Sequence, residues 1–126
     1  MDLQLTNKKV LVSGSTAGIG FAIAALFAQE GAAVVVNGRS EERVNSAVAK
    51  IRQSTGNAEV LGVTADLGTK TGVDLLVSKL PTVDILVNNL GIYEPKPFPE
   101  ITDEDWLRFF EVNVLSGVRF EVDRVV

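Results

Sequence analysis

Three glycines, Gly14, Gly18 and Gly20, follow the first apolar run of the chain and offer the clearest binding chemistry in the sequence. A backbone that turns sharply while a phosphate approaches it closely has no room for Cβ atoms. The free N–H groups at the start of a helix then bind a pyrophosphate, and the helix dipole assists them. The alternative is a tight turn that only packs a helix against a strand. The position of the trio between a strand and a helix favours a dinucleotide site.

Side chains that could hold the rest of a dinucleotide lie near this turn and after the second apolar run. Ser13, Ser15 and Thr16 can add hydroxyl contacts to the phosphates. Gly38 and Arg39 end the second run. An acidic residue there would accept from the ribose 2′-OH, whereas an arginine suits a 2′-phosphate, which a guanidinium can hold in bidentate fashion. The pattern therefore favours NADP(H) over NAD(H), the alternative being a solvated surface arginine.

Further polar residues follow the later apolar runs. Asp66 and Leu67 come after the third run, and Asp66 is either a cofactor ligand or an ordinary turn aspartate. Asn89 and Gly91 come after the fourth run, where an amide can tie neighbouring strands together and a glycine lets the chain pass close to a ligand. Asn113 lies inside an expected helix, where asparagine is unfavourable, so it marks either a functional position or a kink.

Short apolar runs alternate with amphipathic stretches, and these elements must position the candidate residues. Their spacing predicts strands over residues 10–12, 34–36, 60–63 and 85–87, and helices over 19–29, 40–56, 69–80 and 102–118. Strands that are buried on both faces and joined by helices indicate a parallel sheet with right-handed crossovers. We expect one α/β domain over residues 1–126, an incomplete Rossmann-type doubly wound parallel sheet with about four strands in the order 3-2-1-4.

The composition excludes several classes of function. The 126 residues carry a net charge of −4 and no basic run, so nothing favours binding to nucleic acid or to an anionic membrane. Without histidine or cysteine, the sequence excludes a Ser-His-Asp triad, disulfides, and metal sites built on imidazole or thiolate. The sequence begins with no signal-peptide pattern and has no apolar run of transmembrane length. We therefore expect a cytoplasmic protein.

The spacing of the glycines, G-x-x-x-G-x-G, resembles the short-chain dehydrogenase/reductase family, whose signature is Thr-Gly-x-x-x-Gly-x-Gly. Ser13 replaces the threonine and keeps its hydroxyl. Asn88-Asn89-Leu90-Gly91 resembles the family's Asn-Asn-Ala-Gly motif, with Leu90 in the alanine position. The interval from Asn89 to Asn113 also matches the family spacing. The resemblance covers residues 6–119 and is closest to the 3-oxoacyl-carrier-protein reductase type.

This resemblance implies the N-terminal, cofactor-binding part of an NADP(H)-dependent oxidoreductase, which transfers hydride between the nicotinamide and a carbonyl or secondary alcohol. In the family, the residue matching Asp66 accepts a hydrogen bond from the adenine amino group. The residue matching Asn113 is catalytic and helps to hold a proton-relay water. The residues expected to line the cofactor are Gly14, Ser15, Thr16, Gly18, Ile19, Gly20, Arg39, Asp66, Leu67, Asn89 and Gly91.

The family's catalytic serine and its Tyr-x-x-x-Lys motif come later in the family's chains, and none of the three can be assigned in these 126 residues. Tyr93, the only tyrosine, is interpreted as a loop aromatic near the cofactor or substrate edge. Without a proton donor, bound NADPH has no assisted route to reduce a carbonyl, so we expect this chain alone to be inactive. The alternative is a non-catalytic dinucleotide-binding or sensing module. The resemblance implies a small-molecule substrate and, by analogy only, a homodimer or homotetramer.

Overall fold

The computed structural model describes residues 3–91 and 95–119, and it alternates strands with helices as the sequence predicts. The strands are β1 (Lys9–Val12), β2 (Ala33–Gly38), β3 (Val60–Thr64) and β4 (Ile85–Val87). The helices are α1 (Gly18–Gln29), α2 (Glu41–Thr55), α3 (Lys70–Lys79) and α4 (Asp103–Phe110). A 3₁₀ turn, η1 (Phe98–Glu100), precedes α4, and a π-helical segment, η2 (Glu111–Leu115), follows it.

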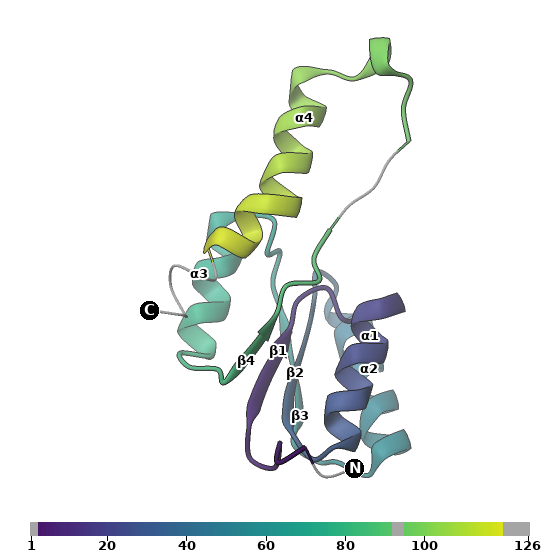
Figure 1. The fold of residues 1–126 in the computed structure, drawn as a ribbon, viewed down its shortest axis with the longest axis vertical. Coiled ribbons are helices and arrows are strands. Elements are labelled where there is room, and N and C mark those ends of the chain that lie inside the picture. Colours follow the sequence, from purple (N-terminus) through teal and green to yellow (C-terminus); the bar gives the residue numbers. More distant parts are fainter. Residues whose placement is uncertain (1–2, 92–94, 120–126) are drawn as a thin grey trace.

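The four strands form one parallel sheet in the order β3-β2-β1-β4, which confirms the predicted topology. Val10 of β1 lies opposite Val34 of β2 on one side and Ile85 of β4 on the other. Figure 1 shows α1 and α2 on one face of the sheet and α3 on the other. The sheet is therefore doubly wound, as parallel strands joined by crossover helices require.

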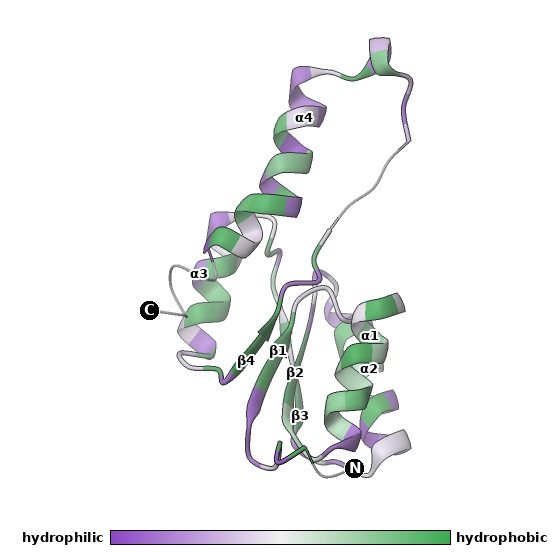
Figure 2. Cartoon of the chain, viewed as in Figure 1, coloured by the Kyte–Doolittle hydropathy of each residue, from purple (hydrophilic) through white to green (hydrophobic). Residues whose placement is uncertain are grey.

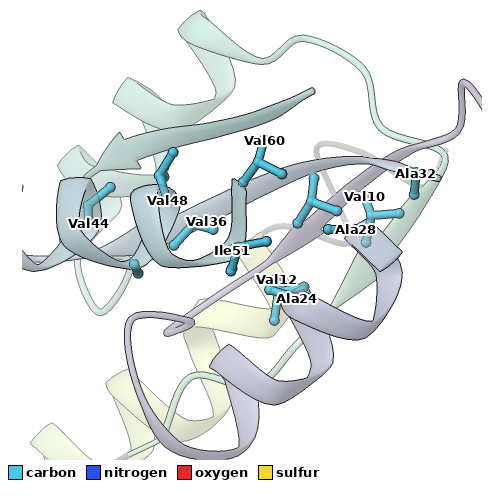
Figure 3. Packing of buried hydrophobic residues seen from close by; sticks show 12 residues of the cluster. Val10, Val12, Ala24, Ala28, Ala32, Val36, Val44, Val48, Ile51 and Val60 are labelled. Carbon is cyan, nitrogen blue, oxygen red and sulfur yellow. The ribbon is translucent and has the colours of Figure 1, made fainter. Parts of the chain in front are cut away.

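Two apolar clusters hold the helices to the sheet because successive strand residues face opposite ways. Val10 and Val12 point to the α1–α2 side, where they pack with Ala24, Val44 and other buried residues (Figure 3). The other cluster lies on the α3 face, and its fully or nearly fully buried members are Leu11, Val35, Ala65, Leu67, Val73, Leu76 and Leu80. The strands thus read as continuous apolar runs, as strands covered on both faces do.

Three helices are capped by side chains at the residues where the sequence predicts those helices to begin. The Ser40 hydroxyl accepts a hydrogen bond from the Arg43 N–H at 3.4 Å, and the Thr69 hydroxyl accepts one from the Gly72 N–H at 3.1 Å. Thr102 and Asp105 form a reciprocal capping box at the start of α4. These side chains satisfy helix N–H groups that have no partner within the helix. The helices α2, α3 and α4 therefore begin where their sequence signals lie.

The last helix differs from the regular helix that the sequence predicts. The α-helical pattern gives way to the π segment η2 and resumes over residues 116–119. Asn113 lies in the middle of η2 between Val112 and Val114, and asparagine and β-branched residues all weaken a regular α-helix. The Ser116 hydroxyl also donates to the Val112 carbonyl at 2.6 Å within this segment. A π segment accommodates one extra residue in a helix and is often found at functional sites.

The α4–η2 helix rises past the carboxyl ends of the strands and extends beyond the sheet (Figure 1). Apolar residues recur along this helix, as its green bands in Figure 2 show. Those with large exposed side chains are Trp106, Leu107, Phe110, Val114 and Val118. Among the described residues, no helix combines the length and apolar composition that crossing a membrane requires.

Candidate dinucleotide-binding site

The parallel sheet brings the predicted site residues together at the carboxyl ends of its strands. The glycine turn follows β1, Arg39 follows β2, Asp66 follows β3, and Asn89 follows β4. Ligands of open α/β sheets bind in the crevice at this edge, where the strand order reverses direction. Here the reversal lies between β1 and β4, which places the glycine turn and Asn89 at the switch point.

The glycine turn has the backbone geometry that its spacing predicts. Gly14 and Gly18 adopt positive φ angles of 59° and 62°. A Cβ on Gly20 would collide with the Asn89 side-chain nitrogen and the Gly14 carbonyl oxygen, so the first turn of α1 can sit this close only with glycine there. Ala17, the N-cap of α1, supplies no side-chain hydrogen bond to the helix. The N–H groups in the first turn of α1 therefore donate no hydrogen bond to the Ala17 side chain. Such N–H groups are the ones that bind a phosphate at the start of a helix.

Two of the three expected hydroxyl contacts are used inside the protein. The Ser15 side chain is fully buried, and its hydroxyl donates to the Val12 carbonyl at 2.8 Å while accepting from the Asn37 N–H at 2.9 Å. Ser13 is 2% exposed, and its hydroxyl accepts from the N–H groups of Asn89 and Leu90. These hydroxyls therefore brace the turn, and Thr16 alone of the three lines the neighbouring pocket.

Asn89 ties β4 to the glycine turn, as its place at a strand end predicts. Its side-chain nitrogen donates to the Gly14 carbonyl at 3.1 Å, and its backbone N–H donates to the Ser13 hydroxyl at 2.9 Å. Leu90, which stands in the family's alanine position, packs beside the α3-face cluster and lines the pockets on both sides of it. Its bulk is thus accommodated within the wall of the site.

Asn37 joins three strand ends through its buried carboxamide, a role that the sequence does not reveal. Its oxygen accepts from the Gly14 N–H at 3.1 Å. Its nitrogen lies 3.2 Å from the carbonyl oxygens of Val63 and Ala65 and donates to both. The side chain is 1% exposed. The glycine turn after β1 and the loop after β3 are therefore held in one arrangement by a residue of β2.

A pocket of about 390 Å³ lies between the glycine turn and the start of α2. Its lining includes Thr16, Arg39, Ser40 and Arg43, and among the described residues it includes no aspartate or glutamate. A Cβ on Gly38 would lie 2.5 Å from Thr16 Cγ2, so this position has no space for a side chain unless Thr16 moves. Within residues 3–91 and 95–119, the pocket is therefore lined by two arginines and by no carboxylate that would accept from a ribose hydroxyl.

A second pocket, of about 320 Å³, adjoins the first, since Arg39 and Leu90 line both. Asp66 lines this second pocket and is exposed, and its carboxylate accepts from the Gly68 N–H at 3.0 Å. Leu67 is 1% exposed, so its side chain belongs to the core while the residue also lines the first pocket. The two pockets together form a continuous crevice along the carboxyl edge of the sheet.

At the β4 end of this crevice, the structure places Asn113 beside Gly91. A Cβ on Gly91 would lie 3.3 Å from the Asn113 side-chain oxygen.

Ile19, another predicted cofactor residue, is 75% exposed at the start of α1. Tyr93 lies outside the described residues. Within those residues, no group of three or more acidic side chains could hold a metal ion.

Sequence reasoning missed Arg43 as well as Asn37. Arg43 follows Arg39 by four residues and falls in the first turn of α2, a spacing that could have placed the two arginines together. Asn37 gives no comparable local signal, because all its side-chain hydrogen-bond partners lie at least 23 residues away in sequence.

Comparison with known proteins identifies the family. The family model described as short chain dehydrogenase matches residues 8–122. The chain is 51% identical over 119 residues to YvaG, an uncharacterized oxidoreductase of Bacillus subtilis, covering 94% of this chain and 45% of YvaG. It is 38% identical over 115 residues to a cyclopentanol dehydrogenase of Comamonas, covering 90% of this chain and 46% of that one.

Solved structures give the same result. The chain superposes on the L-sorbose reductase of Gluconobacter frateurii, crystallised with NADPH and L-sorbose, with a TM-score of 0.90 and 36% identity. The match covers 99% of this chain and 49% of that one. The chain thus spans about half the length of the relatives it matches. On the family model, the sequence identities and the shared fold together, the chain belongs to the short-chain dehydrogenase family.

Proposed function

We propose that the protein, at its natural length, is an NADP(H)-dependent oxidoreductase that interconverts a carbonyl compound and a secondary alcohol. The observation that carries the cofactor choice is the pocket beside the glycine turn, whose described lining contains Arg39 and Arg43 and no carboxylate. The observation that carries the reaction class is membership of a dehydrogenase family. When bound, the nicotinamide ring would supply or accept the hydride.

The residues of the crevice fit each part of the cofactor. The uncapped start of α1 and the backbone of the glycine turn suit the pyrophosphate. Asp66 presents an exposed carboxylate to the second pocket, where it suits the adenine amino group. Arg39 borders both pockets, so its guanidinium can hold a 2′-phosphate while it flanks the adenosine.

The backbone at Gly38 supports NADP(H) over NAD(H). An acidic side chain at the end of β2 is the feature that would bind the free ribose hydroxyls of NAD(H). A Cβ at this position would lie 2.5 Å from Thr16 Cγ2 and 3.2 Å from Val44 Cγ2, so an acidic side chain could enter only if Thr16 moved. The neighbouring pocket is lined by two arginines, which favour a phosphate.

Asn113 is proposed as a member of the catalytic group. It lies at the β4 end of the crevice, beside Gly91, within the π segment of the last helix. A carboxamide there can hold a water by donating and accepting hydrogen bonds at once. The carbonyl or alcohol chemistry also needs a proton donor, which we propose lies outside these 126 residues. We also propose that the protein assembles as a homodimer or homotetramer.

The reaction class is tested by following nicotinamide absorbance while the protein at its natural length is mixed with NADPH and a panel of ketones, aldehydes and keto sugars. We expect oxidation of NADPH with at least one carbonyl class and slower oxidation of NADH with the same compound. The alternative outcome is that the protein binds NADPH tightly, oxidises none of it with any carbonyl compound of the panel, and reduces no NADP⁺ with secondary alcohols. That result would favour a non-catalytic binding or sensing module.

A further inference from the structure

We propose that Arg43 is a specificity-determining residue, the second arm of an arginine pair that binds the cofactor 2′-phosphate. This inference rests on the proposed NADP(H) function and adds a residue to it. Arg43 and Arg39 both line the pocket between the glycine turn and α2, together with Thr16 and Ser40. Two guanidinium groups on one phosphate can satisfy more of its oxygens than one group can.

The positively charged lining of this pocket favours binding of an anion. The whole chain carries a net charge of −4, yet the part of this lining that the structure describes contains two arginines and no acidic residue. Glu41 and Glu42 stand directly before Arg43 in the sequence but do not line the pocket. Within the described residues, neither arginine side chain forms a hydrogen bond or an ion pair. Their charges are therefore free for a ligand.

The position of Arg43 in α2 adds a second argument. It lies in the first turn of the helix, where its backbone N–H donates a hydrogen bond to the hydroxyl of the N-cap residue Ser40. A cation is disfavoured at this end because the helix dipole is positive there. Arg52 stands at the opposite, favourable end of α2, where its side chain donates to the Val60 carbonyl at 2.9 Å. In α2, therefore, the side chain of Arg52 in the last turn is hydrogen-bonded within the protein. That of Arg43 in the first turn is not, within the described residues.

The two arginines have different surroundings, and this separates their roles. Arg39 lines both pockets of the crevice, whereas Arg43 lines only the one beside the glycine turn. The pocket that contains Asp66 suits adenine, which NADPH and NADH share. Loss of Arg39 should therefore weaken both cofactors, and loss of Arg43 should weaken only the one that carries a 2′-phosphate.

The experiment measures dissociation constants of NADPH and NADH for the wild-type protein at its natural length and for Arg43→Gln, Arg43→Lys and Arg39→Gln. Lys50→Gln is the matched control, because Lys50 is an exposed cation of the same helix that does not line the pocket. We expect Arg43→Gln to weaken NADPH about tenfold, as loss of a charge-assisted hydrogen bond does. NADH affinity should not change, and Arg43→Lys should retain part of the NADPH affinity.

The same variants are titrated with adenosine 2′,5′-bisphosphate and with adenosine 5′-monophosphate, which differ only in the 2′-phosphate. Arg43→Gln should weaken the first ligand alone. An equal loss for both ligands, or no loss for either, in a protein that still prefers NADPH would overturn the role of Arg43 and leave the proposed function intact. A wild-type protein that binds NADH as tightly as NADPH would instead overturn the proposed cofactor choice, and the arginine pair with it.

Discussion

The side-chain oxygen of Asn37 accepts a hydrogen bond from the backbone N–H of Gly14 at 3.1 Å, and this contact joins the end of β2 to the glycine turn. The same carboxamide donates to two carbonyl groups near the end of β3. One buried side chain therefore sets the spacing between the turn proposed to bind the pyrophosphate and the loop that bears Asp66. The candidate site therefore depends on a hydrogen bond that a buried side chain makes within the protein.

Replacing Asn37 by aspartate should weaken both the fold and the site. The carboxylate can still accept from Gly14, but it cannot donate to the Val63 and Ala65 carbonyl groups. We expect a loss of about 1–3 kcal/mol in the free energy of unfolding, because buried acceptors are left unpaired. NADPH affinity should fall as well, since the turn loses its spacing. Chemical denaturation and cofactor titration measure the two effects.

Asn57 provides a control of matched chemistry. Its side-chain nitrogen donates to the carbonyl groups of Ala28 and Ala32 at 2.9 Å, and its oxygen accepts from the Glu59 N–H at 2.8 Å. These bonds lie at the amino-terminal edge of the sheet, away from the site. Asn57→Asp should therefore destabilise the fold to a similar degree and leave the NADPH affinity of the folded protein unchanged. Equal losses of affinity in both variants would contradict the positioning role of Asn37.

The contact between Gly38 and Thr16 predicts a dependence that a double-mutant cycle can measure. Gly38→Ala should destabilise the protein by about 1–3 kcal/mol through overpacking, because its Cβ would lie 2.5 Å from Thr16 Cγ2. Thr16→Ser removes that methyl group and keeps the hydroxyl. The cost of Gly38→Ala should then fall clearly in the Thr16→Ser background, with a remainder from Val44. Strictly additive effects would show that the two positions do not touch.

Asn113→Ala tests the proposed catalytic role separately from cofactor binding. We expect turnover to fall about 10²-fold, in the range for assisted proton transfer, while the NADPH dissociation constant stays unchanged. Val114→Ala is the control, because Val114 is an exposed neighbour in the same π segment. If Asn113→Ala loses no more activity than Val114→Ala, Asn113 has no part in the reaction.

The pH dependence of the start of α4 follows from Asp105. The hydrogen bond from the Lys96 ammonium at 2.8 Å, and that from the Thr102 N–H, lower the pKa of Asp105 from 3.8 to about 2. A lowered pKa means that the charged form stabilises the folded state. This contribution is fully present above pH 3.8 and is lost as the pH falls toward 2.

Hydrogen exchange of the backbone N–H groups in the first turn of α4 measures this effect. Protection should decline between pH 3.8 and pH 2 in the wild-type protein, after correction for intrinsic exchange rates. Asp105→Asn keeps an acceptor at the capping position and removes the titrating group. Its protection should be lower above pH 3.8 and should vary less across this window. If Asp105→Asn loses protection over this pH range as the wild-type protein does, a group other than Asp105 causes the decline.

The sequence predicted the parts of the site that depend on local patterns. The glycine spacing, the capping residues Ser40 and Thr102, and the alternation of apolar runs each report on a few neighbouring residues. These local signals indicated a parallel sheet with right-handed crossovers, and the Rossmann-type topology that the glycine turn favours supplied the strand order β3-β2-β1-β4. The order then placed Arg39, Asp66 and Asn89 along one edge.

The features that the sequence did not predict depend on distant contacts or on a small change of helical register. Asn37 reads as an ordinary residue within a strand, because its side-chain partners lie in β3 and in the segments that follow β1 and β3. The buried hydroxyl of Ser15 was expected to face a phosphate, but its partners are Val12 and Asn37. The π segment around Asn113 leaves the apolar pattern of the helix almost unchanged, so periodicity alone could not locate it.

The most direct test of the account is the ratio of the dissociation constants of NADH and NADPH, measured by titration of the wild-type protein at its natural length. Within the described residues, the pocket beside the glycine turn is lined by Arg39 and Arg43, which would suit a 2′-phosphate, and by no carboxylate that would suit a free 2′-hydroxyl. We predict that NADPH binds at least about tenfold more tightly than NADH, the effect of one charge-assisted contact. NADH binding as tight as or tighter than NADPH binding would contradict the account.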